Sequence, residues 1–246
     1  MLGTADYLNL IKSSARQARF ELLSSLPTVL SAMARTRIKI CGVRDVDMAL
    51  TAATAGADAI GLVFVQNSPR FVNPDDAYEI MSALPPMTTA IGVFANHSLE
   101  AFSDIEECCP TPVTQLHGTE DEKLVKKCGP DVIKAIRFDP ETIAKDIERW
   151  TAVDEVCALL IDGANPGSGE AINWEALASF LESVSLPIIL AGGLTPKNVG
   201  AAIELIQPWA VDVSSGVESA PGIKDAELIE AFCKAVRAAD HAADQM

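Results

Sequence analysis

Short apolar runs rich in β-branched residues alternate with longer helical patterns along most of the chain, and this alternation restricts the fold more than any other feature. Such a pattern is typical of βα units that build a parallel sheet. Eight runs are predicted to be strands, at residues 37–43, 59–65, 89–95, 113–118, 132–138, 156–162, 187–193 and 210–216. The clearest helical patterns between them lie at residues 45–55, 74–84, 141–150 and 196–206. Eight units with no strand left over predict a closed (β/α)8 TIM barrel, an α/β fold with a single domain.

The length of the chain agrees with a barrel. Its 246 residues, of which 49% are hydrophobic, suffice for one large core, and α/β barrels commonly use about 250 residues. An open doubly wound sheet is the alternative. The GxGxxG motif that such sheets carry after the first strand is missing, however, because the chain reads CGVRD there.

The charge of the chain restricts its partners. A formal net charge of −15 opposes binding to nucleic acid or to an acidic membrane surface, whereas a few local cationic or N–H groups can still hold a small anion. No uninterrupted apolar run approaches the roughly 20 residues that a membrane span needs. We therefore expect a soluble, cytoplasmic protein with a small-molecule ligand, either a monomer or a homodimer.

The cysteines show neither CxxC spacing nor the Cys/His spacing of zinc sites, so no disulfide framework and no metal site are expected. We expect reduced and mostly buried thiols at Cys41, Cys108, Cys109, Cys128, Cys157 and Cys233.

Residues 1–34 differ in character from the rest, with scattered charges, a leucine-rich patch and no strand pattern. A small-residue site at residues 32–34 resembles the end of a signal peptide, but the region before it is too long and is interrupted by serine and proline. We interpret residues 1–34 as an N-terminal extension that is dispensable for the barrel domain, residues 35–246, which could begin near Met33.

Two reactive side chains stand where predicted strands end. Barrel active sites lie at the C-terminal face, built from residues at the ends of several strands. Cys41 ends the first strand and Asp162 ends the sixth, three steps apart in a ring of eight, so both could approach one ligand as an acid/base pair. The alternatives are a small buried thiol for Cys41 and a loop-anchoring carboxylate for Asp162.

Two glycine-rich turns indicate a phosphate site. Gly192 and Gly193 follow the seventh strand, and Ser214, Ser215 and Gly216 end the eighth, before a segment at residues 217–220 that could open a helical turn. Barrels often bind phosphate with the loops after these two strands and the N-terminus of a small extra helix. The alternative is that the glycines only turn the chain.

With these residues in view, the chain resembles the phosphoribosylanthranilate isomerases over residues 37–236. The motifs that carry the resemblance are KICG (39–42), GLVF and SPR (61–64, 68–70), GVFAN (92–96), QLHG (115–118), KAIR (134–137), LLID, GSG and NW (159–162, 167–169, 173–174), LAGGLTPKNV (190–199) and VDVSSGVESAPGIKD (211–225).

The resemblance implies an Amadori rearrangement of N-(5-phosphoribosyl)anthranilate in tryptophan biosynthesis, without cofactor or metal. Asp162 would be the general acid that opens the sugar ring, and the thiolate of Cys41 would be the base that removes the C2′ proton. Arg70 would grip the carboxylate of the anthranilate, which suits a bidentate guanidinium.

Several roles stay open. Lys39 points to the same face of its strand as Cys41, and either favours the thiolate or pairs with a carboxylate such as Asp212. His117 is interpreted as a packing or hydrogen-bonding residue, and Glu218 as one that orders the phosphate loop or meets sugar hydroxyls.

Two departures from the family pattern, Pro166 and Asn173, affect the loop after the sixth strand.

Other activities remain alternatives. They are a Schiff-base aldolase that uses Lys39 or Lys134, a non-catalytic phosphosugar-binding protein, and an isomerase that also accepts a histidine-pathway substrate.

Overall fold

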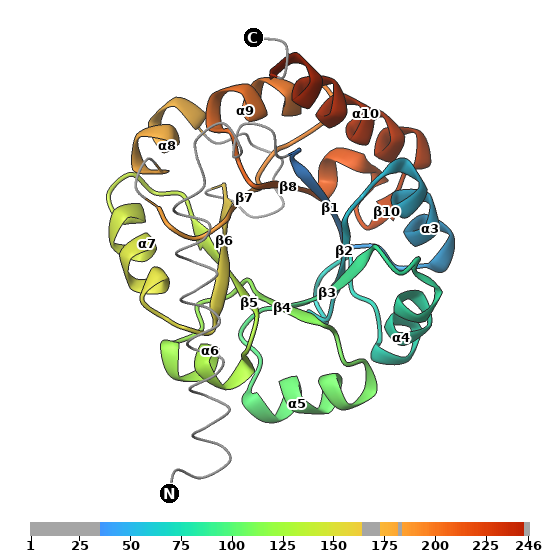
Figure 1. Ribbon diagram of the computed structural model, residues 1–246. Coiled ribbons are helices and arrows are strands. Elements are labelled where there is room, and N and C mark those ends of the chain that lie inside the picture. The colour runs from blue at the N-terminus through green and yellow to red at the C-terminus, as the bar shows by residue number, and fades with distance from the viewer. Residues whose placement is uncertain (1–34, 164–172, 182–183, 244–246) are drawn as a thin grey trace, which may run out of the picture.

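The computed structural model describes residues 35–163, 173–181 and 184–243, and their parallel strands close into one barrel (Figure 1). The strands follow each other in chain order, and β1 pairs with β8 to close the ring. They are β1 (Arg37–Cys41), β2 (Ala59–Val63), β3 (Thr89–Phe94), β4 (Val113–Leu116), β5 (Val132–Arg137), β6 (Val156–Asp162), β7 (Ile188–Leu190) and β8 (Ala210–Val213). The predicted (β/α)8 barrel is confirmed.

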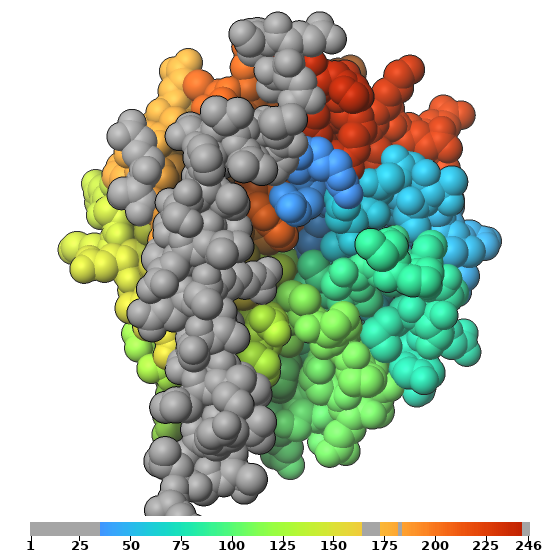
Figure 2. Space-filling model, in the orientation of Figure 1, coloured from blue at the N-terminus to red at the C-terminus, as the bar shows by residue number. Residues whose placement is uncertain are grey.

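Helices surround the barrel and cover its outer face (Figure 1). They are α3 (Val46–Ala55), α4 (Pro74–Ala83), α5 (Leu99–Cys108), α6 (Glu122–Cys128), α7 (Ile143–Thr151), α8 (Trp174–Leu181), α9 (Val199–Ile206) and α10 (Ala226–Ala243). In the space-filling view the coloured segments follow one another around the ring in chain order (Figure 2). Among the described helices none is long and apolar enough to cross a membrane.

One predicted helix begins one residue too early because its first residue acts as the cap. The side chain of Asp45 accepts a hydrogen bond from the backbone N–H of Met48, so α3 begins one residue later than predicted. The same arrangement starts α4 at Asn73, α5 at Ser98 and α6 at Asp121.

Most predicted strands end earlier in the structure, and only the sixth keeps its predicted bounds. Apolar residues continue beyond the last strand hydrogen bond, but the backbone turns away. Gly42 has a φ of 79° immediately after β1, and Gly192 has a φ of 85° shortly after β7. Glycine adopts this left-handed region without the steric cost that a side chain adds. The residues after the strands therefore form the loops that carry the candidate site.

The helical turn predicted at residues 217–220 is wrong in position. A short 3-10 helix, η1 (Ser215–Val217), comes first, and β9 (Glu218–Ala220) then pairs antiparallel with β10 (Ile223–Lys224). This small hairpin brings Glu218 and Lys224 together at the C-terminal end of the barrel.

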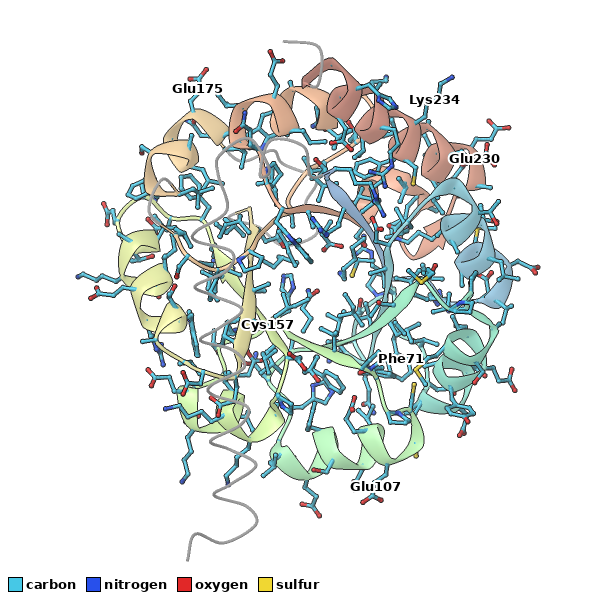
Figure 3. The ribbon with its side chains drawn as sticks, viewed as in Figure 1. Phe71, Glu107, Cys157, Glu175, Glu230 and Lys234 are labelled. Atoms are coloured by element: carbon cyan, nitrogen blue, oxygen red, sulfur yellow. The ribbon has the colours of Figure 1, made fainter. Side chains whose placement is uncertain are left out.

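Two apolar layers stabilise the barrel. The larger one fills the space between strands and helices, and a smaller one, with Ile91, Leu160 and Ile189 among its members, fills the interior of the ring. Figure 3 shows Cys157 within the ring of strands, whereas Glu107 and Glu175 lie on the outer rim. Toward the C-terminal ends of β1, β4 and β6 the inward residues include polar side chains, namely Lys39, Gln115 and Asp162, and these mark the candidate site.

Candidate active site

Cys41 lies inside the barrel at the end of β1, beside a glycine that makes room for it. Gly61 is the register partner of Cys41 on β2. A Cβ atom on Gly61 would lie 2.7 Å from the Sγ of Cys41 and 3.2 Å from the Nζ of Lys39. The space that holds the thiol and the ammonium group therefore exists because residue 61 has no side chain.

Lys39 contacts both groups that the sequence offered as alternatives. Its Nζ donates to Asp212 Oδ1 at 2.8 Å, and it also hydrogen-bonds Cys41. Burial favours the neutral amine, but Asp212 and Cys41 outweigh it and raise the pKa of Lys39. A permanently charged lysine is a poor nucleophile, so the geometry disfavours Lys39 as a Schiff-base residue.

The thiol of Cys41 experiences opposing influences. Burial raises its pKa, Asp212 adds to this effect, and Lys39 and Lys224 oppose it. The balance leaves the pKa of Cys41 above the usual value for a thiol. In the protein without substrate, Cys41 is therefore mainly the neutral thiol at neutral pH.

Arg70 forms a two-pronged ion pair at the same end of the barrel. Its Nε and Nη2 donate to the two carboxylate oxygens of Glu218 at 2.8 and 2.9 Å, and Lys224 donates to the same carboxylate at 2.7 Å. Burial would raise the pKa of Glu218, but these two cations outweigh it and hold the pKa below its usual value. A Cβ on Gly42 would lie 2.7 Å from the Cδ of Arg70, so the arginine stem crosses the chain directly after Cys41.

Lys224 is a member of the site that sequence reasoning did not select. Its Nζ also donates to the backbone carbonyl of Ser214 at 3.0 Å. Its side chain is 2% exposed. Lys224 lies within GIKD, the end of the last motif of the family resemblance, but only the hairpin of β9 and β10 brings it back toward Cys41.

Asp162 ends β6 and belongs to a row of three polar side chains. Its Oδ2 lies 3.1 Å from Nε2 of His117, and Nδ1 of His117 lies 2.8 Å from Nε2 of Gln115. Its Oδ1 accepts from the backbone N–H of Gly163 at 2.7 Å. The interpretation of His117 as a hydrogen-bonding residue is confirmed. Asp162 lies at the end of β6, on the side of the barrel opposite Cys41 at the end of β1.

The two glycine-rich turns lie against each other. A Cβ on Gly216 would lie 1.9 Å from the carbonyl oxygen of Leu194, so the loops after β7 and β8 are in direct contact. Gly192 and Gly193 have φ values of 85° and 65°. The hydroxyl of Ser214 donates to the carbonyl of Cys41 at 3.1 Å, which ties this loop to the end of β1.

Lys134 does not face the barrel interior. Its Nζ donates to the carbonyls of Leu116 and Gly118 and to Oε2 of Glu120, and its side chain is 2% exposed. It fixes the end of β4 against β5 rather than pointing at a ligand. The geometry therefore also disfavours an aldolase based on Lys134.

The residues that depart from the family pattern differ in what can be said of them. Asn173 accepts from the backbone N–H of Ala176 at 3.0 Å and so caps α8. Pro166 lies outside the described residues, as do residues 1–34, so the predictions about that loop and the extension remain predictions.

A closed eight-stranded parallel barrel defines a (β/α)8-barrel enzyme when a buried thiol and a carboxylate end strands on opposite sides of the ring and two glycine-rich loops face each other. The family model described as N-(5'phosphoribosyl)anthranilate (PRA) isomerase matches residues 38–235, and the chain belongs to this family.

Relatives and solved structures agree with this membership. The isomerase of Chlorobaculum parvum is 42% identical over 214 residues, covering 83% of this chain and 96% of the relative, and that of Pseudomonas fluorescens is 44% identical over 207 residues, covering 83% and 97%. The crystal structure from Thermotoga maritima superposes with a TM-score of 0.74 at 36% identity, and the one from Thermus thermophilus with 0.73 at 36%. Each of these covers 82% of this chain and 99% of the solved one.

Proposed function

We infer that the protein catalyses the isomerisation of N-(5'-phosphoribosyl)anthranilate in tryptophan biosynthesis, and we propose the following roles for its residues. Membership of the isomerase family across residues 38–235 carries the inference. One related structure is a complex with reduced 1-(o-carboxyphenylamino)-1-deoxyribulose 5-phosphate, a phosphosugar analogue of the product. The chemistry of the site is compatible with such a ligand, because it offers an acid, a base and cations for the anionic groups.

Asp162 is the general acid of the first step. It donates a proton to the ring oxygen of the ribose, the bond from that oxygen to C1′ breaks, and a cationic imine forms. Its position at the mouth of the barrel, with Oδ1 fixed by the N–H of Gly163, directs the other oxygen toward His117 and the ligand space.

Cys41 is the base of the second step. The thiolate removes the C2′ proton of the imine to give an enolamine, whose enol oxygen then loses a proton while C1′ gains one. Burial raises the pKa of the Cys41 thiol in the resting protein, so the thiolate must be favoured by added positive charge. Lys39 and Lys224 supply part of that charge, and the cationic imine supplies the rest.

Arg70 binds the anthranilate carboxylate by exchanging partners. Glu218 occupies Nε and Nη2 of Arg70 in the protein without substrate. Lys224 is a second cation on the same carboxylate, so Glu218 keeps a partner when Arg70 turns to the ligand. The exchange replaces one charge-assisted bidentate pair by another and leaves no buried charge unpaired.

The phosphate is held by the facing loops after β7 and β8. Backbone N–H groups near Gly193, Ser215 and Gly216 can approach its oxygens because glycines leave the backbone accessible. Ser214 acts by fixing this loop to β1, since its hydroxyl already donates to the carbonyl of Cys41. Gly192 leaves room for Asp162, whose Oδ1 would lie 2.9 Å from a Cβ at that position.

The proposal includes no cofactor, metal, nucleic acid or membrane partner, and places the protein in the cytoplasm. A related isomerase from Thermotoga maritima is described as dimeric, so both a monomer and a homodimer are compatible with the family. Size-exclusion chromatography with light scattering separates the two states.

The fluorescence of phosphoribosylanthranilate tests the activity. Adding catalytic amounts of the protein should make the signal decay at a rate proportional to enzyme concentration. No decay beyond the spontaneous rate at micromolar protein would contradict the assigned activity.

A further inference from the structure

Three side chains from two strands form a hydrogen-bonded row beside the general acid. Gln115 and His117 come from β4 and its end, and Asp162 ends β6. The distances are 2.8 Å from Gln115 Nε2 to His117 Nδ1 and 3.1 Å from His117 Nε2 to Asp162 Oδ2. Gln115 is completely buried.

The hydrogens of this row can be assigned from its donors. The amide nitrogen of Gln115 can only donate, so Nδ1 of His117 accepts and carries no proton. The imidazole proton then lies on Nε2 and is donated to Oδ2 of Asp162. In this arrangement the contact between His117 and Asp162 holds one proton, that of the imidazole.

The amide oxygen of Gln115 takes no part in this row of hydrogen bonds. Oε1 is buried and has no hydrogen-bond partner within the part of the chain that the structure describes. A buried acceptor without a donor is costly, and such groups call for an explanation. The oxygen lies on the same amide that faces His117, so rotation of the amide by half a turn would place it against Nδ1.

One additional proton would satisfy this oxygen. If the pair of His117 and Asp162 gains a proton in the contact between them, it becomes either an imidazolium beside a carboxylate, or a carboxylic acid whose proton faces Nε2 of an imidazole that carries its own proton on Nδ1. Both forms have a hydrogen on Nδ1, and both need an acceptor there. Among the residues that the structure describes, the rotated amide of Gln115 provides one.

We propose that His117 is a positioning residue that shares the acid proton with Asp162, and that the Gln115 amide rotates each time this proton arrives or leaves. The proposal deepens the proposed function, since it rests on Asp162 as the general acid. In the proton-loaded state the amide oxygen of Gln115 accepts from Nδ1 of His117. After the proton passes to the ring oxygen, the amide returns to the arrangement seen in the structure.

The protons balance over the cycle. The loaded pair loses one proton to the ring oxygen, and Cys41 gains one from C2′. The tautomerisation releases a proton from the enol oxygen and consumes one at C1′. These two transfers restore the proton of the pair and the thiolate of Cys41.

Charged groups on the surrounding elements bear on this proton. Arg137 of β5 is the register partner of Asp162. Behind β4 and β5, Lys134 and Glu120 form a buried ion pair whose charges largely cancel at a distance. Across the ring, the ammonium of Lys39 is paired with Asp212, next to Cys41.

The neighbouring strands β3 and β7 place no charged side chain beside the row of Gln115, His117 and Asp162 among the described residues. On β3 the inward residue Val93, in register with Gln115, is apolar. On the side of β7, the chain contributes Gly192 next to Asp162. The amide of Gln115 is therefore the polar group placed to respond to a proton on Nδ1.

Substitutions at Gln115 test the proposal through the pH dependence of kcat. In Gln115→Glu the new carboxylate accepts from Nδ1 and retains the shared proton, so the alkaline loss of kcat should move upward by about one pH unit or more. In Gln115→Met no acceptor remains, and the same loss should move downward. Unchanged alkaline limits in both variants would overturn the proposal, because a merely structural glutamine affects stability and KM but not this limit.

A measurement on the unaltered protein keeps the test independent of folding and of turnover. Nitrogen-15 NMR of the His117 ring should show Nδ1 changing from an acceptor to an N–H as the pH falls through the alkaline limit of kcat. A neutral ring with its proton on Nε2 throughout that range would contradict the proposal. If the unaltered protein shows no isomerase activity, the proposed function fails, whereas the NMR titration still reports on the row.

Discussion

At the scale of single residues, the thiol of Cys41 depends on charges that come from distant parts of the chain. Lys39 lies on the same strand, so its approach to Cys41 follows from the alternation of side chains along β1. Lys224 reaches the same thiol from the β9–β10 hairpin, which the local sequence around Cys41 does not indicate. Burial and Asp212 raise the pKa of the thiol, and the two lysines oppose them.

Removing either lysine should therefore raise the pKa of the Cys41 thiol further. In Lys39→Met and in Lys224→Met, the pH midpoint for alkylation of Cys41 by iodoacetamide should rise by about one unit or more relative to the unaltered protein. Mass spectrometry of the peptide that contains Cys41 separates its reaction from that of the exposed Cys108. Lys234→Met, at an exposed position on α10, is the matched control (Figure 3).

An unchanged midpoint in Lys39→Met would remove the activation of the thiol by this lysine. The ion pair with Asp212 would then be its whole role.

At the scale of secondary-structure elements, the close pairing of β1 with β2 shapes the site. Gly61 stands opposite Cys41 in the register of the two strands, and an added methyl group would overlap the thiol. Gly200 lies in the first turn of α9, where the nearest atom to an added Cβ is 4.0 Å away. Alanine variants at these two positions therefore distinguish an effect on the site from the general effect of replacing a glycine.

Gly61→Ala should lower kcat at least tenfold, because the methyl group displaces Cys41 or Lys39 from its position. Gly200→Ala should leave kcat unchanged and raise the free energy of unfolding by about 0.5–1 kcal/mol, since alanine favours the helix. Steady-state kinetics and urea denaturation of both variants check this pair. Equal kinetics in Gly61→Ala and the unaltered protein would show that the fit around Cys41 is loose.

The buried ion pair of Glu120 and Lys134 joins the loop after β4 to β5. Oε1 of Glu120 accepts from the N–H groups of Asn96 and Gly118, while Oε2 accepts from Lys134. Burial would raise the pKa of Glu120, but Lys134 and the N–H of Asn96 outweigh it and lower the pKa. The carboxylate therefore holds three segments together.

Breaking this pair on one side should be strongly destabilising. Glu120→Gln or Lys134→Met should each lower the free energy of unfolding by about 3–5 kcal/mol, and the double variant should lose less than the sum. Because the folded pKa of Glu120 is depressed, its contribution is present above the unfolded value of about 4.3 and is lost as the pH falls through the folded pKa. Denaturation curves at neutral and acidic pH measure both effects, and strict additivity in the double variant would contradict the coupling.

At the scale of the whole molecule, the barrel could be predicted because eight strand patterns recur with helices between them. Cys41 and Asp162 could be selected because parallel strands in a barrel end at one face. The exact strand ends could not, since apolar residues such as Val43 continue past the turn at Gly42.

Contacts that depend on side-chain positions across the ring were also beyond the sequence. The ion pair of Glu218 with Arg70, and the Gln115 oxygen that has no partner among the described residues, depend on the folded positions of residues far apart in the chain. Burial and competition between partners decide these contacts, and neither is visible in a local pattern.

The extension before the barrel gives a prediction for the entire chain. The family match begins at residue 38, after the extension. A protein that lacks residues 1–32 should fold, with circular dichroism and kcat within about twofold of the full chain. Loss of the folded signal or of activity on truncation would show that the extension belongs to the working domain.

The roles of Cys41 and Asp162 in turnover are the central claim, and separating binding from catalysis tests them most directly. Calorimetric titration with the reduced product analogue, together with the fluorescence assay, should be done on the unaltered protein, Cys41→Ser and Asp162→Asn. Both variants should bind the analogue within a few-fold of the unaltered protein, while kcat falls by about 10²–10⁴-fold in each. Turnover by either variant at close to the unaltered rate would contradict the assignment of that residue as the acid or the base.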